Sequence, residues 1–407
     1  MEALSSCARM DRPQRGSAAE VFATFLRLGL TSFGGPIAHL GYFRREIVER
    51  RRWVTEAQFA QVLALCQFLP GPASSQMGFS LGLLRAGWAG ALAAFVAFTA
   101  PSALLLFAFA MLLPAVPAAI AGVLVHGLKL VAVAVVAHGV LGMARNLCPD
   151  AIRASIAAAA GFAILALGGA WTQLAVVAAG AIAGLALCRD ARSPPSEAPA
   201  LPHGRRAGFI LLAAYALLLA ALPLAANALG GAAALAWAFY RAGALVFGGG
   251  HVVLPLLQHA VVDPGWLTRD EFLAGYGAAQ AVPGPMFTLA SYLGARIGDV
   301  LGPAGNACIA TGAIFLPGFL LIGAVLPLWR SLSGHPAAAR AIAGVNAAVV
   351  GLLAAALYDP VWTSAIASPV DAGIAIAGFA MLAAWRAPAL AVVAWCLAAT
   401  FARAAFA

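Results

Sequence analysis

Charged residues are scarce in this sequence. Only 10% of its 407 residues are Asp, Glu, Lys or Arg, whereas 63% are hydrophobic and the mean hydropathy is +0.92. A soluble globular domain carries about 25% charged residues. Because so few polar side chains cannot cover a water-facing surface, the composition excludes a soluble fold and indicates a polytopic membrane protein.

The sequence signatures of several chemistries are also missing. The six cysteines form no CxxC pair, which excludes a disulfide framework and a zinc site and indicates small apolar packing residues. The sequence contains no Walker A motif, no dinucleotide-binding fingerprint and no HExxH motif. We therefore expect no metal, no cofactor and no direct drive by ATP.

The formal net charge of +9 would suit a nucleic-acid-binding protein. Its arginines, however, lie in short segments between apolar stretches, as they do in the cytoplasmic loops of membrane proteins. We therefore expect the lipid bilayer as a partner and no nucleic acid. Residues 1–20 are polar and lack the apolar core of a cleavable signal peptide, which predicts a cytoplasmic tail.

Helix-breaking residues interrupt the apolar stretches twice, in matching order. The first half contains TSFGGP at 31–36 and PGP at 70–72, and the second half contains LVFGGG at 245–250 and PGP at 283–285. We call 31–36 and 245–250 the glycine breaks, and 70–72 and 283–285 the PGP loops. Equivalent residues are 213 to 216 positions apart along the two halves, so the pattern predicts an internal duplication.

The apolar stretches differ in length. The pieces 57–69 and 72–84 beside the first PGP loop are about 20 Å long as helices, too short for a hydrocarbon core of about 30 Å. The stretches that are long enough or marginal are 89–113, 118–143, 151–167, 170–188, 208–227, 306–328, 338–358, 364–384 and 388–405. We predict nine crossings and four re-entrant or half-helix pieces, and the count rises towards thirteen if the broken pieces cross fully.

The charged loops predict how the two halves are oriented. If the basic loop 44–53 is cytoplasmic, the basic loops 145–153 and 189–206 are also cytoplasmic, and the extra span 208–227 inverts the second half. The acidic loop 262–272 then lies outside, as the positive-inside rule requires. We predict an all-α polytopic membrane protein with two inverted-topology repeats. Its parts are a cytoplasmic tail (1–20), a first repeat (21–188), a basic linker with the inverting span (189–231) and a second repeat (232–407).

Inverted repeats with matching broken helices are typical of secondary transporters, whose site lies near the midplane between the repeats. Unwound backbone at that depth must be buried in protein or line a cavity. A proline suits the first turn of a helix, and the free amides of a helix N-terminus attract anions. We therefore predict that Pro72 and Pro285 open short helices whose amides bind an anion.

The predicted binding residues come from the glycine breaks, the PGP loops and the polar residues beside them. They are Arg27, Gly34, Gly35, Pro36, Gln67, Pro70, Gly71, Pro72, Ser74, Ser75, Arg241, Gly248, Gly249, Gln280, Pro283, Gly284, Pro285 and Thr288. Acidic residues are almost absent from the predicted spans, which favours an anion over a cation as substrate.

Several of these residues have a plainer interpretation. The PGP loops can be structural kinks, Arg27 and Arg241 can extend to the membrane interface, and the glutamines can bond a neighbouring carbonyl. Lys129 lies in a span without a matched partner and is a weaker candidate. His39 and His126 are interpreted as hydrogen-bonded core histidines, with a proton relay as the alternative.

Six short runs carry a resemblance to a known family. They are FLRLG at 25–29, SFGGP at 32–36, HLGYFR at 39–44, LPGP at 69–72, FGGG at 247–250 and PGP at 283–285. In these motifs the chain resembles the long, two-domain form of the chromate ion transporter (CHR) family. The central linker is not part of that pattern.

The resemblance implies a multi-pass protein of a bacterial-type inner membrane that exports chromate and confers chromate resistance, with sulfate as the structural analogue. It therefore implies an oxyanion as the substrate and no enzymatic activity. An anion channel and a transporter for another oxyanion such as sulfate remain alternatives, and an intramembrane enzyme acting on lipid phosphates lacks the base or nucleophile cluster it would need. A homodimer remains open.

Overall fold

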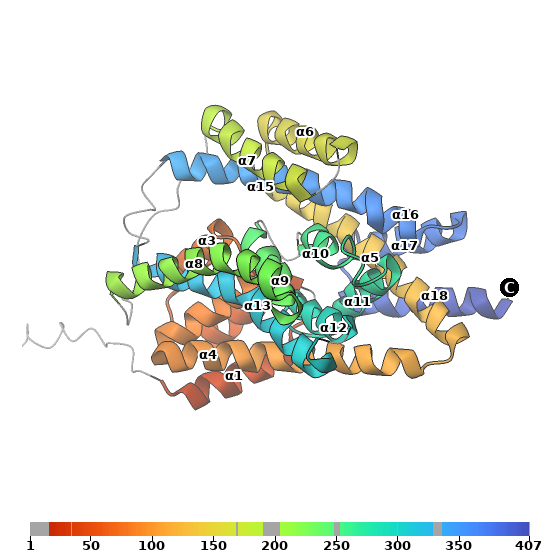
Figure 1. The fold of residues 1–407 in the computed structure, drawn as a ribbon, viewed down its shortest axis with the longest axis horizontal. Coiled ribbons are helices and arrows are strands. Elements are labelled where there is room, and N and C mark those ends of the chain that lie inside the picture. The colour runs from red at the N-terminus through yellow and green to blue at the C-terminus, as the bar shows by residue number, and fades with distance from the viewer. Residues whose placement is uncertain are drawn as a thin grey trace, which may run out of the picture.

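The computed structural model describes residues 16–33, 35–167, 170–189, 204–247, 253–298, 300–328 and 336–406. Every regular element in these ranges is a helix, and none is a strand, which confirms the all-α fold (Figure 1). Most of the predicted tail, most of the linker, Gly34 of the first glycine break and residues 248–250 of the second lie outside the described residues.

The helices of the first repeat follow the predicted apolar stretches. In chain order they are α1 (Ala18–Thr31), α2 (Gly35–Phe43), α3 (Glu56–Phe68), α4 (Ala73–Leu112), α5 (Ala118–Leu147), α6 (Ala151–Leu167) and α7 (Ala170–Leu187). A π-helical turn (Arg44–Arg50) follows α2, and a 3₁₀ turn (Leu113–Ala115) follows α4.

The helix α8 (Arg205–Leu229) corresponds to the predicted inverting span and precedes the second repeat. The helices of the second repeat are α9 (Gly231–Leu245), α10 (Val253–Val261), α11 (Arg269–Ala281), α12 (Leu289–Arg296), α13 (Gly302–Val325), α15 (Pro336–Ala356), α16 (Thr363–Ala365), α17 (Pro369–Ala383) and α18 (Ala389–Phe406). Short helical turns lie at Met286–Thr288, Leu326–Leu328 and Leu357–Trp362.

The equivalent helices α3 and α11 begin in the same way. The side chains of Thr55 and Thr268 accept hydrogen bonds from the backbone N–H of Gln58 and Glu271, whose own side chains accept from the backbone of the two threonines. This capping box satisfies amides that a helix start leaves unpaired. The match between the two starts supports the internal duplication.

The segment after α2, predicted as a basic loop, is helical instead. Its acidic residues lie about one turn from its arginines, and Glu46 accepts hydrogen bonds from Arg50 at 3.2 Å and from Arg51 at 2.7 Å. Opposite charges at this spacing stabilise a helix. The prediction was wrong because it counted the arginines of this segment without pairing them.

Helix α4 contains the break that was expected between a half-helix and a crossing. Ala86 and Gly87 leave the helical region, and Gly87 has a φ of +67°. The half-helix before them is buried along most of its length. In the second repeat the corresponding break separates α12 from α13.

Within the described ranges, five helical segments are long and apolar enough to cross a membrane by length and composition. They are Ala73–Ala115, Ala118–Leu147, Arg205–Leu229, Gly302–Val325 and Pro336–Ala365. The other four predicted crossings correspond to α6, α7, α17 and α18, which have 15 to 18 residues and are about 23–27 Å long. That these four helices cross remains a prediction.

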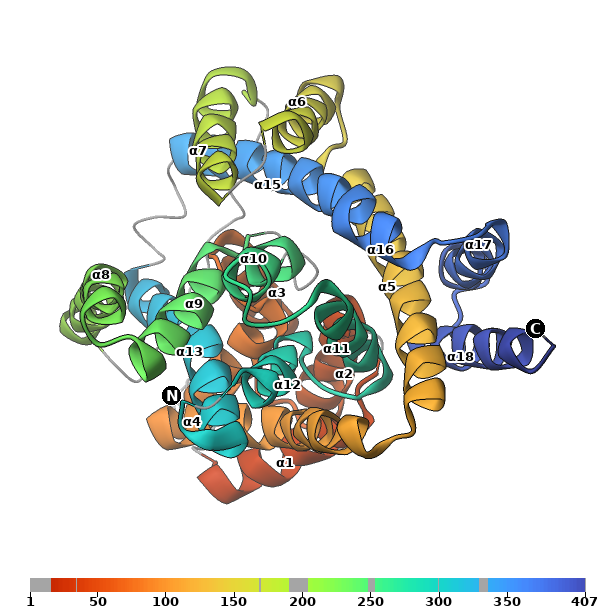
Figure 2. The same ribbon diagram turned by 45° about the vertical axis from the view of Figure 1, so that its right-hand side comes forward.

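The two repeats exchange their outer helices. Helix α5 of the first repeat is covered by α17 and α18 of the second, and α15 of the second repeat is covered by α6 and α7 of the first. Figure 2 shows α5 and α15 as a curved wall around the remaining helices, with the covering pairs on its outer side. The close approach of α7 to α15 depends on glycine, because a Cβ on Gly344 would overlap the carbonyl oxygen of Gly180.

Candidate functional site

Each PGP loop is hydrogen-bonded to the glycine break of the other repeat. The backbone N–H of Gly71 donates to the carbonyl oxygen of Val246 at 2.7 Å, and that of Gly284 donates to the carbonyl oxygen of Ser32 at 2.9 Å. Ser32 and Val246 occupy equivalent positions, as do Gly71 and Gly284. The structure therefore brings the predicted loops and breaks into contact across the interface between the repeats.

Both loops are tightly enclosed and need glycine at their centres. Gly71 and Gly284 have φ values of +126° and +102°, which residues with a side chain rarely adopt. A Cβ on Gly71 would lie 3.0 Å from the Cα of Gly318 in α13, and a Cβ on Gly284 would lie 2.8 Å from the Oγ of Ser102 in α4. Each loop is thus packed against the long helix of the opposite repeat.

A helix opens after each loop, as predicted. Pro72 precedes α4, in which the N–H of Gln76 is bonded to the Pro72 carbonyl at 2.9 Å, so the amides of residues 73–75 belong to the unpaired first turn. Pro285 precedes a 3₁₀ turn that leads into α12. The tighter turn closes earlier, because the N–H of Thr288 already bonds the Pro285 carbonyl at 3.0 Å.

The hydroxyl groups beside the two loops differ in whether they already have a hydrogen-bond partner. Ser74 and Ser75 are buried, and the Oγ of Ser75 has no hydrogen-bond partner among the described residues. The Oγ1 of Thr288 donates to the Pro285 carbonyl at 2.6 Å. Thr288 was predicted to donate to the ligand, but its proton is used within its own turn.

The matched glutamines are placed differently. Gln280 is buried at the end of α11, and its Nε2 has no partner in the part of the chain that the structure describes. Gln67 is exposed near the end of α3. Equivalent positions in the sequence therefore do not place both amides among the buried loops.

The matched arginines are not gathered with the buried loops either. Arg27 is exposed on α1, and Arg241 is half-buried on α9 with its guanidinium 5.7 Å from the ring centroid of Trp237. Gly35 begins α2 with a φ of +75° and open space around it, and the backbone of Pro36 belongs to the same helix. The predicted residues Gly34, Gly248 and Gly249 lie outside the described residues.

Two buried residues that were not in the predicted binding set present acceptor atoms. The Nε2 of His39 is 3.2 Å from the Ser32 carbonyl and must donate to it, which leaves Nδ1 as a lone-pair acceptor. The Nε2 of Gln76 donates to the carbonyls of Pro70 at 2.9 Å and Gly318 at 3.0 Å, which leaves Oε1 as an acceptor. Neither Nδ1 of His39 nor Oε1 of Gln76 has a partner within the described ranges. The hydrogen-bonded core histidine that we expected at position 39 is satisfied on one nitrogen only.

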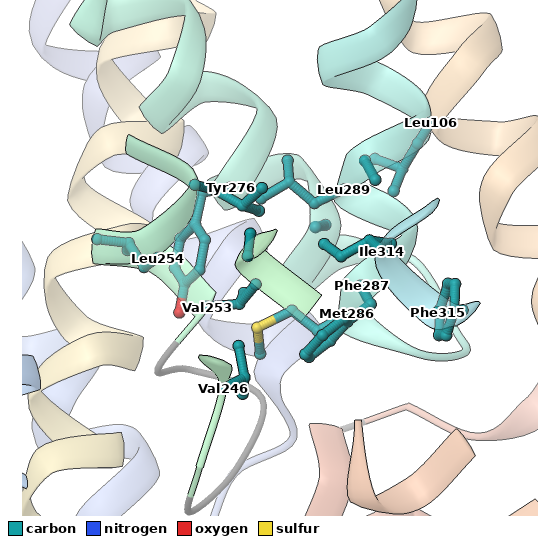
Figure 3. Packing of buried hydrophobic residues seen from close by; sticks show 14 of the residues in the cluster. Leu106, Val246, Val253, Leu254, Tyr276, Met286, Phe287, Leu289, Ile314 and Phe315 are labelled. Atoms are coloured by element: carbon teal, nitrogen blue, oxygen red, sulfur yellow. The ribbon is translucent and has the colours of Figure 1, made fainter. Parts of the chain in front are cut away.

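These polar residues have apolar counterparts in the second repeat. Ser32, His39, Gln76 and the buried Thr99 correspond, in this order, to Val246, Val253, Leu289 and Phe315. Figure 3 shows these four apolar residues in a packed cluster with Met286 and Phe287, which follow the second PGP loop. The backbone arrangement is nearly symmetric, but the polar side chains at these positions come from the first repeat.

Two polar side chains of helix α5 are paired with carboxylates of the second repeat. Lys129 donates to Asp270 of α11 at 2.8 Å, and the Nε2 of His126 lies 2.8 Å from Asp371 of α17. Asp371 is 1% exposed and also accepts from Arg403 of α18 at 2.6 Å. Asp270 belongs to the predicted acidic loop, and Asp371 is the one acidic residue within the predicted crossings, so acidic residues are almost absent from them as expected. Among the described residues, no group of three His, Cys, Asp or Glu side chains could hold a metal ion.

Comparison with known proteins agrees with the motifs. The family model described as chromate transporter matches residues 19–185 and again residues 233–401. A chromate transport protein of Pseudomonas aeruginosa is 29% identical over 390 residues, which are 92% of this chain and 89% of that protein. One of Cupriavidus metallidurans is 30% identical over 351 residues, 82% of this chain and 80% of that protein. A protein of Synechococcus elongatus named probable chromate transport protein is 31% identical over 344 residues, 82% of each chain. No solved structure matches significantly.

Proposed function

Because the chain belongs to the chromate transporter family, we propose that it is a secondary transporter that exports chromate and thereby confers chromate resistance. Sulfate is the structural analogue that we expect to compete. In this proposal the segment Arg44–Arg50 and the N-terminus lie on the cytoplasmic side, where the substrate enters.

The observation that carries the proposal is the reciprocal bonding of the PGP loops. Gly71 and Gly284 each donate to the opposite glycine break, so both loops lie in the interface between the inverted repeats, where transporters of this architecture bind substrate. The oxyanion binds beside this interface. The amides of the first turn of α4, the hydroxyl of Ser75 and the amide of Gln280 supply the donors.

The electrical energy of export is large enough to drive it. A negative cell interior favours the exit of an anion by about 2.3 kcal/mol per charge for each 100 mV, or about 4.6 kcal/mol for a bare dianion. Such a driving force needs no ATP site. It also needs no intramembrane carboxylate reserved for a coupling ion.

Chromate transport driven electrically should respond to an imposed membrane potential. In inside-out vesicles that contain the protein, the accumulation of chromate is expected to follow a potassium–valinomycin diffusion potential of either sign. Vesicles without the protein are the control. Chromate flux that ignores the potential and depends on a pH gradient instead would contradict electrical drive, and flux that never saturates with chromate would identify a channel.

The buried Gln280 and the exposed Gln67 should respond differently to the same substitution. Gln280→Leu is expected to weaken half-saturation by chromate about tenfold, because a donor to a charged ligand contributes about 1.5–3 kcal/mol. Gln67→Leu is the matched control and should change it little, since Gln67 is exposed. Replacing a buried donor without a partner does not destabilise a protein, so the melting temperature of Gln280→Leu should not fall. Equal effects of the two substitutions would contradict the assignment.

A further inference from the structure

We infer that His39 accepts a hydrogen bond from a protonated oxyanion, so that the bound form of the substrate is hydrogen chromate. This inference rests on the proposed function, because it names the form of the substrate at that same site. It replaces the bare dianion by a monoanion that carries its own proton.

The hydrogen bond of the His39 ring fixes its tautomer. A carbonyl oxygen only accepts hydrogen bonds, so the contact of Nε2 with the Ser32 carbonyl at 3.2 Å places the ring proton on Nε2. Complete burial penalises a charged imidazolium, so the ring is neutral and presents a bare lone pair at Nδ1. His39 is 0% exposed, and Nδ1 is without a partner among the residues that the structure describes. A buried acceptor without a donor is unfavourable, so this position calls for a donor from a ligand.

The lone pair of His39 lies close to the second PGP loop. The Ser32 carbonyl oxygen accepts from both Nε2 of His39 and the N–H of Gly284, so one shared acceptor links the imidazole to the second PGP loop. On its other side the ring contacts Phe98 of α4 edge-on, with centroids 5.4 Å apart, and Thr99 follows Phe98 in the chain. His39 thus belongs to the enclosed region around the loop rather than to the outer surface of α2.

The unpaired acceptors select a ligand that can donate a hydrogen bond. A bare dianion offers only lone pairs and would be repelled by the acceptor of His39, and equally by Oε1 of Gln76 near the first PGP loop. Hydrogen chromate offers one O–H that donates to Nδ1, while its remaining oxygens accept from the backbone amides and Gln280. Hydrogen chromate is a weak acid that is present near neutral pH, whereas hydrogen sulfate is a strong acid and is not. The site therefore prefers chromate to sulfate by one proton, and sulfate competes only weakly.

The second repeat does not duplicate this acceptor, because Val253 stands at the position equivalent to His39. The site thus has one such acceptor and recognises one O–H group of the substrate, not two. Export then moves one net negative charge with each chromium. Neither Phe98 nor Ser32, which the ring contacts from α4 and from the end of α1, can titrate, so the pH dependence assigned here is that of the substrate.

The experiment uses the full-length protein in proteoliposomes and compares the wild type with His39→Gln. The amide Nε2 of the glutamine can keep the bond to the Ser32 carbonyl, whereas its acceptor Oε1 does not lie at the position of Nδ1. In the wild type, we expect initial chromate flux to follow the concentration of hydrogen chromate as the pH rises at constant total chromate. We expect phosphate, which carries a proton at neutral pH, to compete better than sulfate.

In His39→Gln, the preference for phosphate over sulfate as competitor is expected to shrink by about tenfold or more. His126→Gln is the matched control, since its ring is paired with Asp371, and it should keep the wild-type preference. Flux that follows total chromate, or equal competition by sulfate in the wild type and in His39→Gln, would overturn the inference and leave chromate export standing. An absence of any chromate flux in proteoliposomes that contain the wild-type protein would overturn the proposed function itself.

Discussion

Replacing Gly71 by alanine is expected to reduce chromate transport by about tenfold or more. The φ of +126° at this position is costly for any residue with a side chain, at about 1–3 kcal/mol. The new Cβ would also lie 2.8 Å from Nε2 of Gln76 and 3.0 Å from the Cα of Gly318. The loop can relieve the overlap only by moving away from α13, which strains the bond from Gly71 to the Val246 carbonyl.

The measurement is chromate flux per molecule of inserted protein, so that a loss of flux is separated from a loss of expression. Gly41→Ala is the matched control, because Gly41 lies within α2 with no atom within 4 Å of the place a methyl group would take, and alanine is the better helix former by about 1 kcal/mol. Gly284→Ala should resemble Gly71→Ala, since its Cβ would meet Ser102. Normal flux in both loop variants would mean that the loops need no fixed geometry.

Replacing Asp371 by asparagine is expected to destabilise the protein by about 1–2 kcal/mol. The carboxylate is 1% exposed and is bonded to His126 and Arg403, which come from two other helices. Hydrogen bonds to charged groups contribute about 1.5–3 kcal/mol. The lower figure allows for the partial exposure of Arg403, whose side chain is 43% accessible.

The melting temperature of the purified protein measures this effect. Glu49→Gln is the control, because Glu49 forms an ion pair with Arg44 in which both side chains are 50% exposed, and such pairs contribute about 0–1 kcal/mol. The double variant Asp371→Asn, Arg403→Gln should be less destabilised than the sum of the single variants. Strict additivity would show that the two residues do not stabilise each other.

Local rules predicted the parts of the fold that depend on neighbouring residues in the chain. Proline and glycine end and begin helices at both PGP loops, so these loops and the helices after them could be placed from the sequence. The duplication could be predicted because two equal spacings of rare motifs are visible in one chain. The inverted repeats of helices follow from that duplication together with the additional helix α8.

The direction in which a side chain points depends on how its helix is rotated against its neighbours, and a single sequence does not contain that information. Gln67 and Gln280 are equivalent in sequence, yet one is exposed and the other buried. The hydroxyl of Thr288 was expected to be free, but a 3₁₀ turn brings the Pro285 carbonyl within its reach. The acceptor at His39 was missed because the bond that fixes its tautomer comes from Ser32, across the glycine break.

The exchange of outer helices has a consequence for biosynthesis. Both charged partners of α5, Asp270 and Asp371, belong to the second repeat, as do its covering helices α17 and α18. While the ribosome is still making the second half, α5 must reside in the bilayer with the Lys129 ammonium unneutralised and with His126 lacking its hydrogen-bond partner. Helix α5 therefore reaches its final packing only after α17 and α18 have been made, and a chain that stops after the first repeat leaves Lys129 without its carboxylate partner.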